Sequence, residues 1–238
     1  MTDWPHPLVS INDRALVRLV PATYHKPPVL RGLTDTDDEA AILADLDAMT
    51  NRRLEAEKSG TPALDRRELI FARRAHDLKI YGQTHINAAF AYTRDTGNRF
   101  NDASRGAWYC AYDLATSAAE VGFHKTRELA YTRSYIDETR YVELLCDIVA
   151  DVPDLHSNRT HPALKADPDI GYPAGQTLAL DLRKQGHRAL LYPSVRKPNG
   201  RCLVAFDPSL VQNVRPGASW VFSWSGTPDY TLSAADMA

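Results

Sequence analysis

The sequence lacks the motifs that mark the commonest nucleotide-binding, metal-dependent and acyl-transfer enzymes. It contains neither a GxxxxGK[ST] nor a GxGxxG segment, which excludes the two glycine-rich routes to a bound nucleotide. No HExxH or CxxC spacing occurs and the eight histidines are scattered, so we expect no metal site. No serine stands in a GxSxG elbow. These absences leave a narrower field of functions.

Long apolar runs and an excess of one charge are also missing. No uninterrupted apolar stretch approaches the roughly 20 residues of a membrane-spanning helix, so we expect no membrane contact. The 28 Lys and Arg against 30 Asp and Glu give a net charge of −2, which provides no basic field for nucleic acid. The three cysteines are far apart and no secretory signal is visible, which together favour reduced thiols and a cytoplasmic location.

What is present predicts one α+β domain over residues 1–238. Apolar residues make up 44% of the chain, enough for a sizeable core. Helices are expected over 113–124, capped by Asp113, and over 175–186, where Gly186 is the C-cap, while 152–173 is expected to form a loop. Aromatic and branched residues predict strands at 14–21, 107–112, 135–150 (one or two strands), 189–192, 202–206 and 220–224.

A mostly helical block is expected between residues 34 and 95. Thr36 and Glu39 have capping-box spacing, Asp65 and Glu68 open a second helical region, and 81–93 is a candidate for a separate helix. None of these segments contains a catalytic motif. The simplest interpretation is an insertion beside the core, and whether it is neutral, a dimer surface or a cover over a pocket stays open.

Four polar residues stand out beside apolar strands or small helical residues. Arg18 interrupts the first strand, where alternation allows it to point into water. Arg99 precedes the aromatic strand and is either a loop charge or a clamp on a phosphate or carboxylate. Glu120 needs a partner unless its helix face is solvated. Ser194 follows a buried strand, where it belongs to a site or simply to a turn.

Taken together, the segments that carry these residues resemble the RES domain family, which is named for its Arg, Glu and Ser. The resemblance covers 14–20 and about 98–210, and the block 34–95 is not part of the short family pattern. Arg99 stands at the arginine of the family's Gly-Arg-Trp segment, although its neighbours here are Asn98 and Phe100. The other matching positions are Arg18 in the first strand, Tyr109, the helical Glu120, and Ser194 after Tyr-Pro.

The resemblance implies a fold, a reaction and a partner. The fold would be a mixed or antiparallel sheet like that of the ADP-ribosyltransferase toxins, with the helical insertion added. The reaction would be cleavage of the nicotinamide–ribose bond of NAD⁺, with NAD⁺ as substrate and no prosthetic group. Family members look like toxins of bacterial toxin–antitoxin pairs, so an antitoxin of helix-turn-helix type is the implied protein partner. A homodimer is left open.

That chemistry suits these residues without a metal. Nicotinamide is a cationic leaving group that needs no general acid, and a carboxylate such as Glu120 stabilises the charge that its departure leaves on the ribose. Arg99 and Arg18 would hold the pyrophosphate. Tyr109 would stack on nicotinamide or is simply strand core. Ser194 would bind the nicotinamide amide or a ribose hydroxyl, so Glu120, Arg99, Tyr109 and Ser194 are the candidate catalytic residues.

Two alternative functions remain at this point. A mono-ADP-ribosyltransferase would differ only in the acceptor, a protein side chain in place of water or phosphate. Such enzymes often carry an acidic residue or glutamine two positions before the catalytic glutamate, and here that position is Ala118. A non-catalytic binding module is the second alternative. Arg196 receives no role beyond a surface ion pair.

Overall fold

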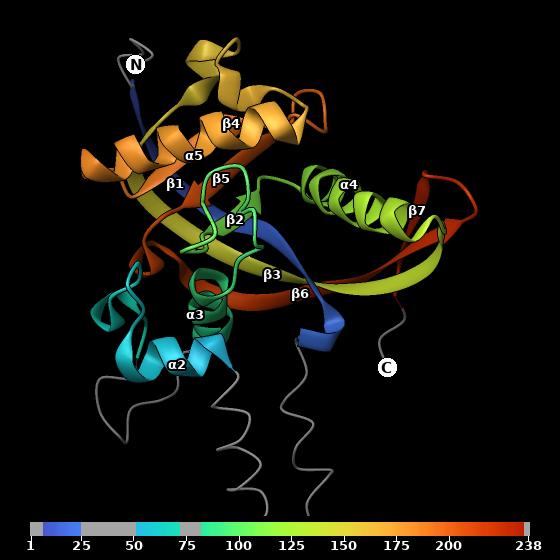
Figure 1. Ribbon diagram of the computed structural model, residues 1–238, viewed down its shortest axis with the longest axis horizontal. Helices are drawn as coiled ribbons and strands as arrows, with labels where there is room; N and C mark the ends of the chain where they lie inside the picture. Colours follow the sequence, from blue (N-terminus) through green and yellow to red (C-terminus); the bar gives the residue numbers. More distant parts are fainter. Residues whose placement is uncertain (1–6, 25–50, 72–81, 236–238) are drawn as a thin grey trace, which may run out of the picture.

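An antiparallel sheet of seven strands organises the part of the chain that the computed structural model describes, residues 7–24, 51–71 and 82–235. The strand order is β4-β5-β2-β1-β3-β6-β7, and the long strands β1, β3 and β6 curve across the molecule (Figure 1). The strands are β1 (Leu8–Pro21), β2 (Trp108–Ala111), β3 (Ile136–Pro153), β4 (Ala189–Pro193), β5 (Arg201–Ala205), β6 (Gln212–Ser225) and β7 (Tyr230–Ala234).

Helices cover both faces of this sheet. α4 (Leu114–Thr132) and α5 (Pro168–Lys184) lie on one face, and α2 (Arg52–Ser59) and α3 (Gln83–Ala91) lie on the other (Figure 1). Short 3-10 turns join them: η1 (Ala22–Tyr24), η3 (Arg66–Glu68), η4 (Leu155–Asn158), η5 (Pro162–Leu164) and η6 (Pro208–Leu210). None of the helices in the described ranges is both long enough and apolar enough to cross a membrane.

The core is divided by the sheet into separate apolar clusters. On the α3 side, Phe90 packs with Leu16 and Trp108. On the other side, α5 contributes Leu182 to one cluster, and α4 contributes Ala118 to another. Because successive strand residues point to opposite faces, each strand supplies both sides of the sheet. This alternation decides which polar side chains meet at the site described below.

The predicted α+β class is confirmed, and several element boundaries change. The segment 135–150 is one strand that continues to Pro153, and the helix expected over 113–124 continues to Thr132. The predicted loop 152–173 contains η4, η5 and the beginning of α5, so the helix expected from 175 begins at Pro168. β7 was not predicted, since it is a short and largely exposed edge strand.

Within the block 34–95 the outcome is mixed. The separate helix expected in 81–93 is confirmed as α3. The capping box of Asp65 and Glu68 is also present, but it opens only the single turn η3, because the backbone of Leu69 is extended. The capping-box segment 36–39 and residues 72–81 lie outside the described residues.

Candidate functional site

Glu120 and Ser194 form the polar centre of the face that α4 and α5 cover. The Ser194 hydroxyl donates a hydrogen bond of 2.6 Å to Oε1 of Glu120. The same hydroxyl oxygen accepts bonds from the main-chain N–H groups of Arg196 and Lys197, each at 3.1 Å. With its acceptor capacity used by the turn, the hydroxyl is directed as a donor at the carboxylate. The half-buried Glu120 therefore has the fixed partner that its position requires.

Local sequence explains why these two residues meet. α4 is capped by Asp113, whose carboxylate accepts a 2.7 Å bond from the N–H of Thr116. Ser194 opens the turn between β4 and β5, and its N–H donates to the carbonyl of Gly200 at 2.8 Å. A side chain at Gly200 would lie 2.8 Å from the Thr116 side chain, so the glycine allows the first turn of α4 to pack against this turn.

Three aromatic rings continue the site beyond Glu120, and we call them the aromatic row. Phe123 and His124 follow Glu120 on α4, with ring centroids 5.4 Å apart. Tyr172 of α5 lies next to His124, with centroids 6.4 Å apart and its hydroxyl 3.4 Å from His124 Nε2. Since residues three and four apart share a helix face, the first two rings stand on the same side of α4 as Glu120.

Each ring of the aromatic row contacts a guanidinium group. Arg196 lies with Cζ 3.3 Å from the Phe123 centroid, and Arg99 with Cζ 5.2 Å from the Tyr172 centroid. Arg94 Nη1 donates a 3.0 Å hydrogen bond to Nδ1 of His124. Flat cations on aromatic faces form a surface that is positively charged and only partly hydrated.

The charge on this surface is unbalanced. Burial, followed by the cations of Arg94, Arg196, Arg127 and Arg99, lowers the pKa of His124 to about 3. The imidazole is therefore neutral at pH 7 and accepts from Arg94, while the four arginines keep their charges. Glu120 is the carboxylate that acts on Arg196 and Tyr172 from within the site. The arrangement suits an anionic ligand with more than one negative charge.

Arg99 is integrated into the fold rather than extended into open space. Its side chain is only 6% exposed, and Nη1 donates to the carbonyls of Ala163 and Lys165 at 2.6 and 2.9 Å. A side chain on Gly171 would lie 2.7 Å from that nitrogen. Arg99 thus ties the loop before β2 to η5 and the residue that follows it, and it lies next to Tyr172 of α5.

Tyr109 has a similar role at the end of this loop. Its hydroxyl donates to Asn101 Oδ1 and accepts from the N–H of Phe100, both at 2.9 Å. Burial raises the pKa of this phenol well above its usual value. Because the hydroxyl is used to hold the loop 98–101, the geometry favours the interpretation of Tyr109 as a strand residue that orders the loop.

Arg18 contacts the main chain of Tyr109 but is not brought together with Glu120 and Ser194. Its guanidinium lies 4.7 Å from the Trp108 ring centroid and donates to the main-chain carbonyl of Tyr109 at 3.1 Å. Trp108 belongs to the cluster on the α3 side, whereas Tyr109 packs with the α5 cluster. Arg18 therefore lies on the face opposite Glu120, half-buried under the sheet rather than pointing into water.

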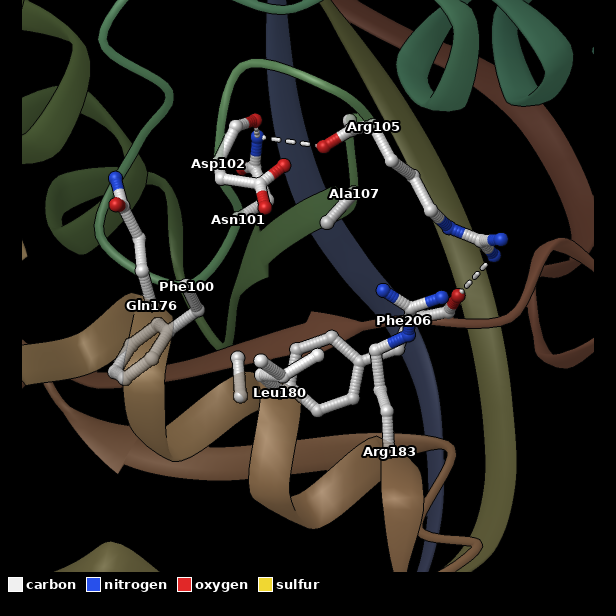
Figure 2. A pocket seen from close by; sticks show the side chains of 11 residues that line it. Phe100, Asn101, Asp102, Arg105, Ala107, Gln176, Leu180, Arg183 and Phe206 are labelled. Atoms are coloured by element: carbon white, nitrogen blue, oxygen red, sulfur yellow. Dashed lines mark hydrogen bonds between the residues drawn. The ribbon is translucent and has the colours of Figure 1, made fainter. Parts of the chain in front are cut away.

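A separate hollow lies between α5 and the loop that leads to β2 (Figure 2). Arg105 crosses its upper side and donates to the Phe206 carbonyl at 2.7 Å, while also pairing with Glu68 at 2.7 Å. The side chains around this hollow include Phe100, Asp102, Arg105, Leu180, Arg183 and Phe206. Neither Glu120 nor Ser194 lines it, so the hollow is not part of the candidate site.

Sequence reasoning missed most of the aromatic row and its arginines. Phe123, His124 and Arg127 stand three, four and seven residues after Glu120, a helical spacing that was available as a signal. Arg94 and Tyr172 carried no local signal because they come from distant segments. Arg196 was expected to make a surface ion pair, but it stacks on Phe123 and donates to the Ala166 carbonyl at 2.6 Å. Among the residues that the structure places, no three His, Cys, Asp or Glu side chains group as metal ligands.

Fold and site together define an α+β domain in which a serine-bound glutamate lies beside a cluster of arginine and aromatic side chains. Such a cluster suits a small anionic ligand. A family model described as RES domain matches residues 71–225, and the chain belongs to this family. The match contains Arg99, Tyr109, Glu120 and Ser194. The matched region begins inside the block 34–95, and the strands β1 and β7 lie outside the matched region. A search of curated proteins finds no match.

Proposed function

We propose that this protein breaks the nicotinamide–ribose bond of NAD⁺, with water or phosphate as the acceptor. The observation that carries the proposal is the Glu120 carboxylate, held by Ser194 at 2.6 Å beside an arginine-lined aromatic row. Membership of the RES domain family supports it, because the family resembles NAD-degrading toxins with an ADP-ribosyltransferase-like fold. The curved antiparallel sheet is compatible with that relationship.

Glu120 would act on the ribose. When the bond between C1′ and the pyridinium nitrogen breaks, its electron pair goes to nicotinamide, which leaves as a neutral molecule. Positive charge then develops on C1′ and the ring oxygen, and a nearby carboxylate stabilises it. Ser194 binds Oε1 and leaves Oε2 to face the ribose. The acceptor oxygen finally bonds to C1′ and releases its proton to the carboxylate or to solvent.

The arginines beside the aromatic row would bind the pyrophosphate. Arg196 and Arg94 contact the aromatic row, and Arg127 lies close enough to lower the pKa of His124 further. These three replace Arg18 in the role expected from the sequence, since Arg18 faces the other side of the sheet. Arg99 would act mainly by positioning Tyr172 and the loop before β2.

The surroundings of Ala118 favour water or phosphate over a protein acceptor. Ala118 is buried, and its carbonyl accepts a 3.1 Å bond from the Tyr230 hydroxyl. The position two residues before Glu120 therefore offers no side chain to orient an acceptor residue of another protein. We further propose a role as the toxin of a toxin–antitoxin pair, held inactive in the cytoplasm by a helix-turn-helix antitoxin, on the strength of the family resemblance.

The test is nicotinamide release by Glu120→Gln, a variant that keeps the shape and the hydrogen bond but removes the charge. We expect turnover to be lost, because the developing charge on the ribose is no longer stabilised, while NAD⁺ binding measured by calorimetry persists. Glu128→Gln is the matched control, since Glu128 lies on the same helix, is 65% exposed and pairs with Lys125 at 3.3 Å. Undiminished release by Glu120→Gln would refute the assignment.

A further inference from the structure

An open groove of about 300 Å³ lies between α4 and the turn that joins β6 to β7. Its lining includes Ala119, Phe123 and Thr126 of α4, together with Arg196, Asp229 and Tyr230. This volume lies at the lower end of the range of roughly 300–1,000 Å³ that is usual for small-molecule sites. The groove combines two aromatic side chains, one guanidinium, one carboxylate and two hydroxyls.

The groove is continuous with the candidate site. Phe123 and Arg196 line it and are also the first ring and the first guanidinium of the aromatic row. Ala119, the residue before Glu120, also lines it. A ligand with its reacting bond at Glu120 and its phosphates on Arg196 would therefore continue into this groove.

The wall formed by the β6–β7 turn is built against α4 by specific contacts. The Thr126 hydroxyl donates to the Pro228 carbonyl at 3.3 Å and accepts from Trp224 Nε1 at 3.0 Å. Gly122 allows the Tyr230 ring to approach, because a methyl group there would lie 2.6 Å from Cζ of that ring. The turn and β7 follow residue 225, where the family match ends, so this wall is a feature of this chain beyond the matched region.

We propose that the groove binds the adenosine half of NAD⁺. The inference rests on the proposed function, and it adds the location of the adenosine end of the dinucleotide. An aromatic wall suits a flat base, the Arg196 guanidinium suits the phosphate attached to the adenosine, and a carboxylate such as Asp229 accepts hydrogen bonds from ribose hydroxyls. The turn after β6 thereby determines specificity for the dinucleotide.

The test compares NAD⁺ with nicotinamide mononucleotide, which has the same scissile bond but no adenosine. Ala119→Phe places a ring in the groove without removing a polar group. We expect its kcat/KM for NAD⁺ to fall by about tenfold or more, and its kcat/KM for the mononucleotide to stay within about twofold of the wild type. Ala130→Phe is the matched control, because Ala130 is exposed on the same helix and does not line the groove.

A binding measurement makes the result independent of turnover. AMP, the half of the dinucleotide assigned to the groove, should bind the wild type and Ala130→Phe in calorimetry and should not bind Ala119→Phe. An equal loss for both substrates, an unchanged kcat/KM for NAD⁺, or AMP binding that Ala119→Phe leaves intact would overturn the inference. If the wild type binds AMP but cleaves neither substrate, the proposed reaction fails while the groove assignment stands.

Discussion

Gly175→Ala tests how closely α5 must approach the loop that carries Arg99. An ideal β-carbon at Gly175 would fall well inside contact distance of the Arg99 carbonyl oxygen, and it would lie 3.1 Å from the carbonyl carbon and 3.2 Å from Cγ of the same residue. The nearest atoms belong to the main chain, so no side-chain rotation relieves the overlap. Either α5 or the loop before β2 has to move.

Two opposing effects set the magnitude. Alanine in place of glycine inside a helix stabilises it by about 1 kcal/mol. Overpacking a close contact costs about 1–3 kcal/mol, and the upper part of that range applies where the obstacle is backbone. We therefore expect Gly175→Ala to lower the free energy of unfolding by about 1–2 kcal/mol. For a chain of this length that corresponds to a fall in Tm of about 2–8 °C.

Urea and thermal denaturation measure this change directly. Thr177→Ala is the control, since Thr177 is exposed on α5 and its hydroxyl donates only within the helix, to the Pro173 carbonyl at 3.0 Å. Its free energy of unfolding should stay within about 0.5 kcal/mol of the wild type. A Gly175→Ala protein as stable as the wild type, or more stable, would refute the argument that the approach of α5 to Arg99 is sterically required.

Two further variants probe the site itself. Ser194→Ala removes a hydrogen bond to a charged group, which is worth about 1.5–3 kcal/mol. The kcat/KM for NAD⁺ should therefore fall by roughly ten- to a hundredfold. An unchanged kcat/KM would contradict the role of Ser194. Because burial and the arginines lower the pKa of His124 to about 3, the unfolded chain takes up this proton first, near pH 6.5. As the pH falls from 6.5 to 3, the free energy of unfolding should therefore decrease by up to about 1.4 kcal/mol per pH unit. His124→Gln should remove this contribution to the pH dependence. An unchanged dependence of the free energy of unfolding on pH in the variant would count against a buried neutral His124.

Local signals account for the parts of the fold that were predicted correctly. The Asp113 cap and the aromatic strand that contains Trp108 act within a few residues of the chain. The cap predicted at Gly186 is displaced by one residue: Gln185 is the C-cap of α5, and Gly186 follows it with a φ of 86°. β7 carries little apolar burial and therefore little periodic signal. The length of α4 was underestimated because its second half is largely exposed and polar.

The site depends on contacts that local patterns do not contain. Glu120 and Ser194 are 74 residues apart, and only the family resemblance joined them in advance. The placement of Arg18 required the register of β1, which shifts between Asp13 and Leu16 and thereby resets which residues face each side. Tyr172 enters the site because α5 begins at Pro168, earlier than the apolar pattern indicated.

The most direct test of the proposed reaction is mass spectrometry of the products when purified protein is incubated with NAD⁺, with and without phosphate. The account predicts nicotinamide together with ADP-ribose or its phosphorylated form, and no products from Glu120→Gln. The contradicting result would be NAD⁺ that stays intact after incubation with fresh wild-type protein, even with phosphate and cell lysate present as acceptors. That result would speak against hydrolysis, phosphorolysis and transfer to a protein alike, and a binding module would then be the better explanation.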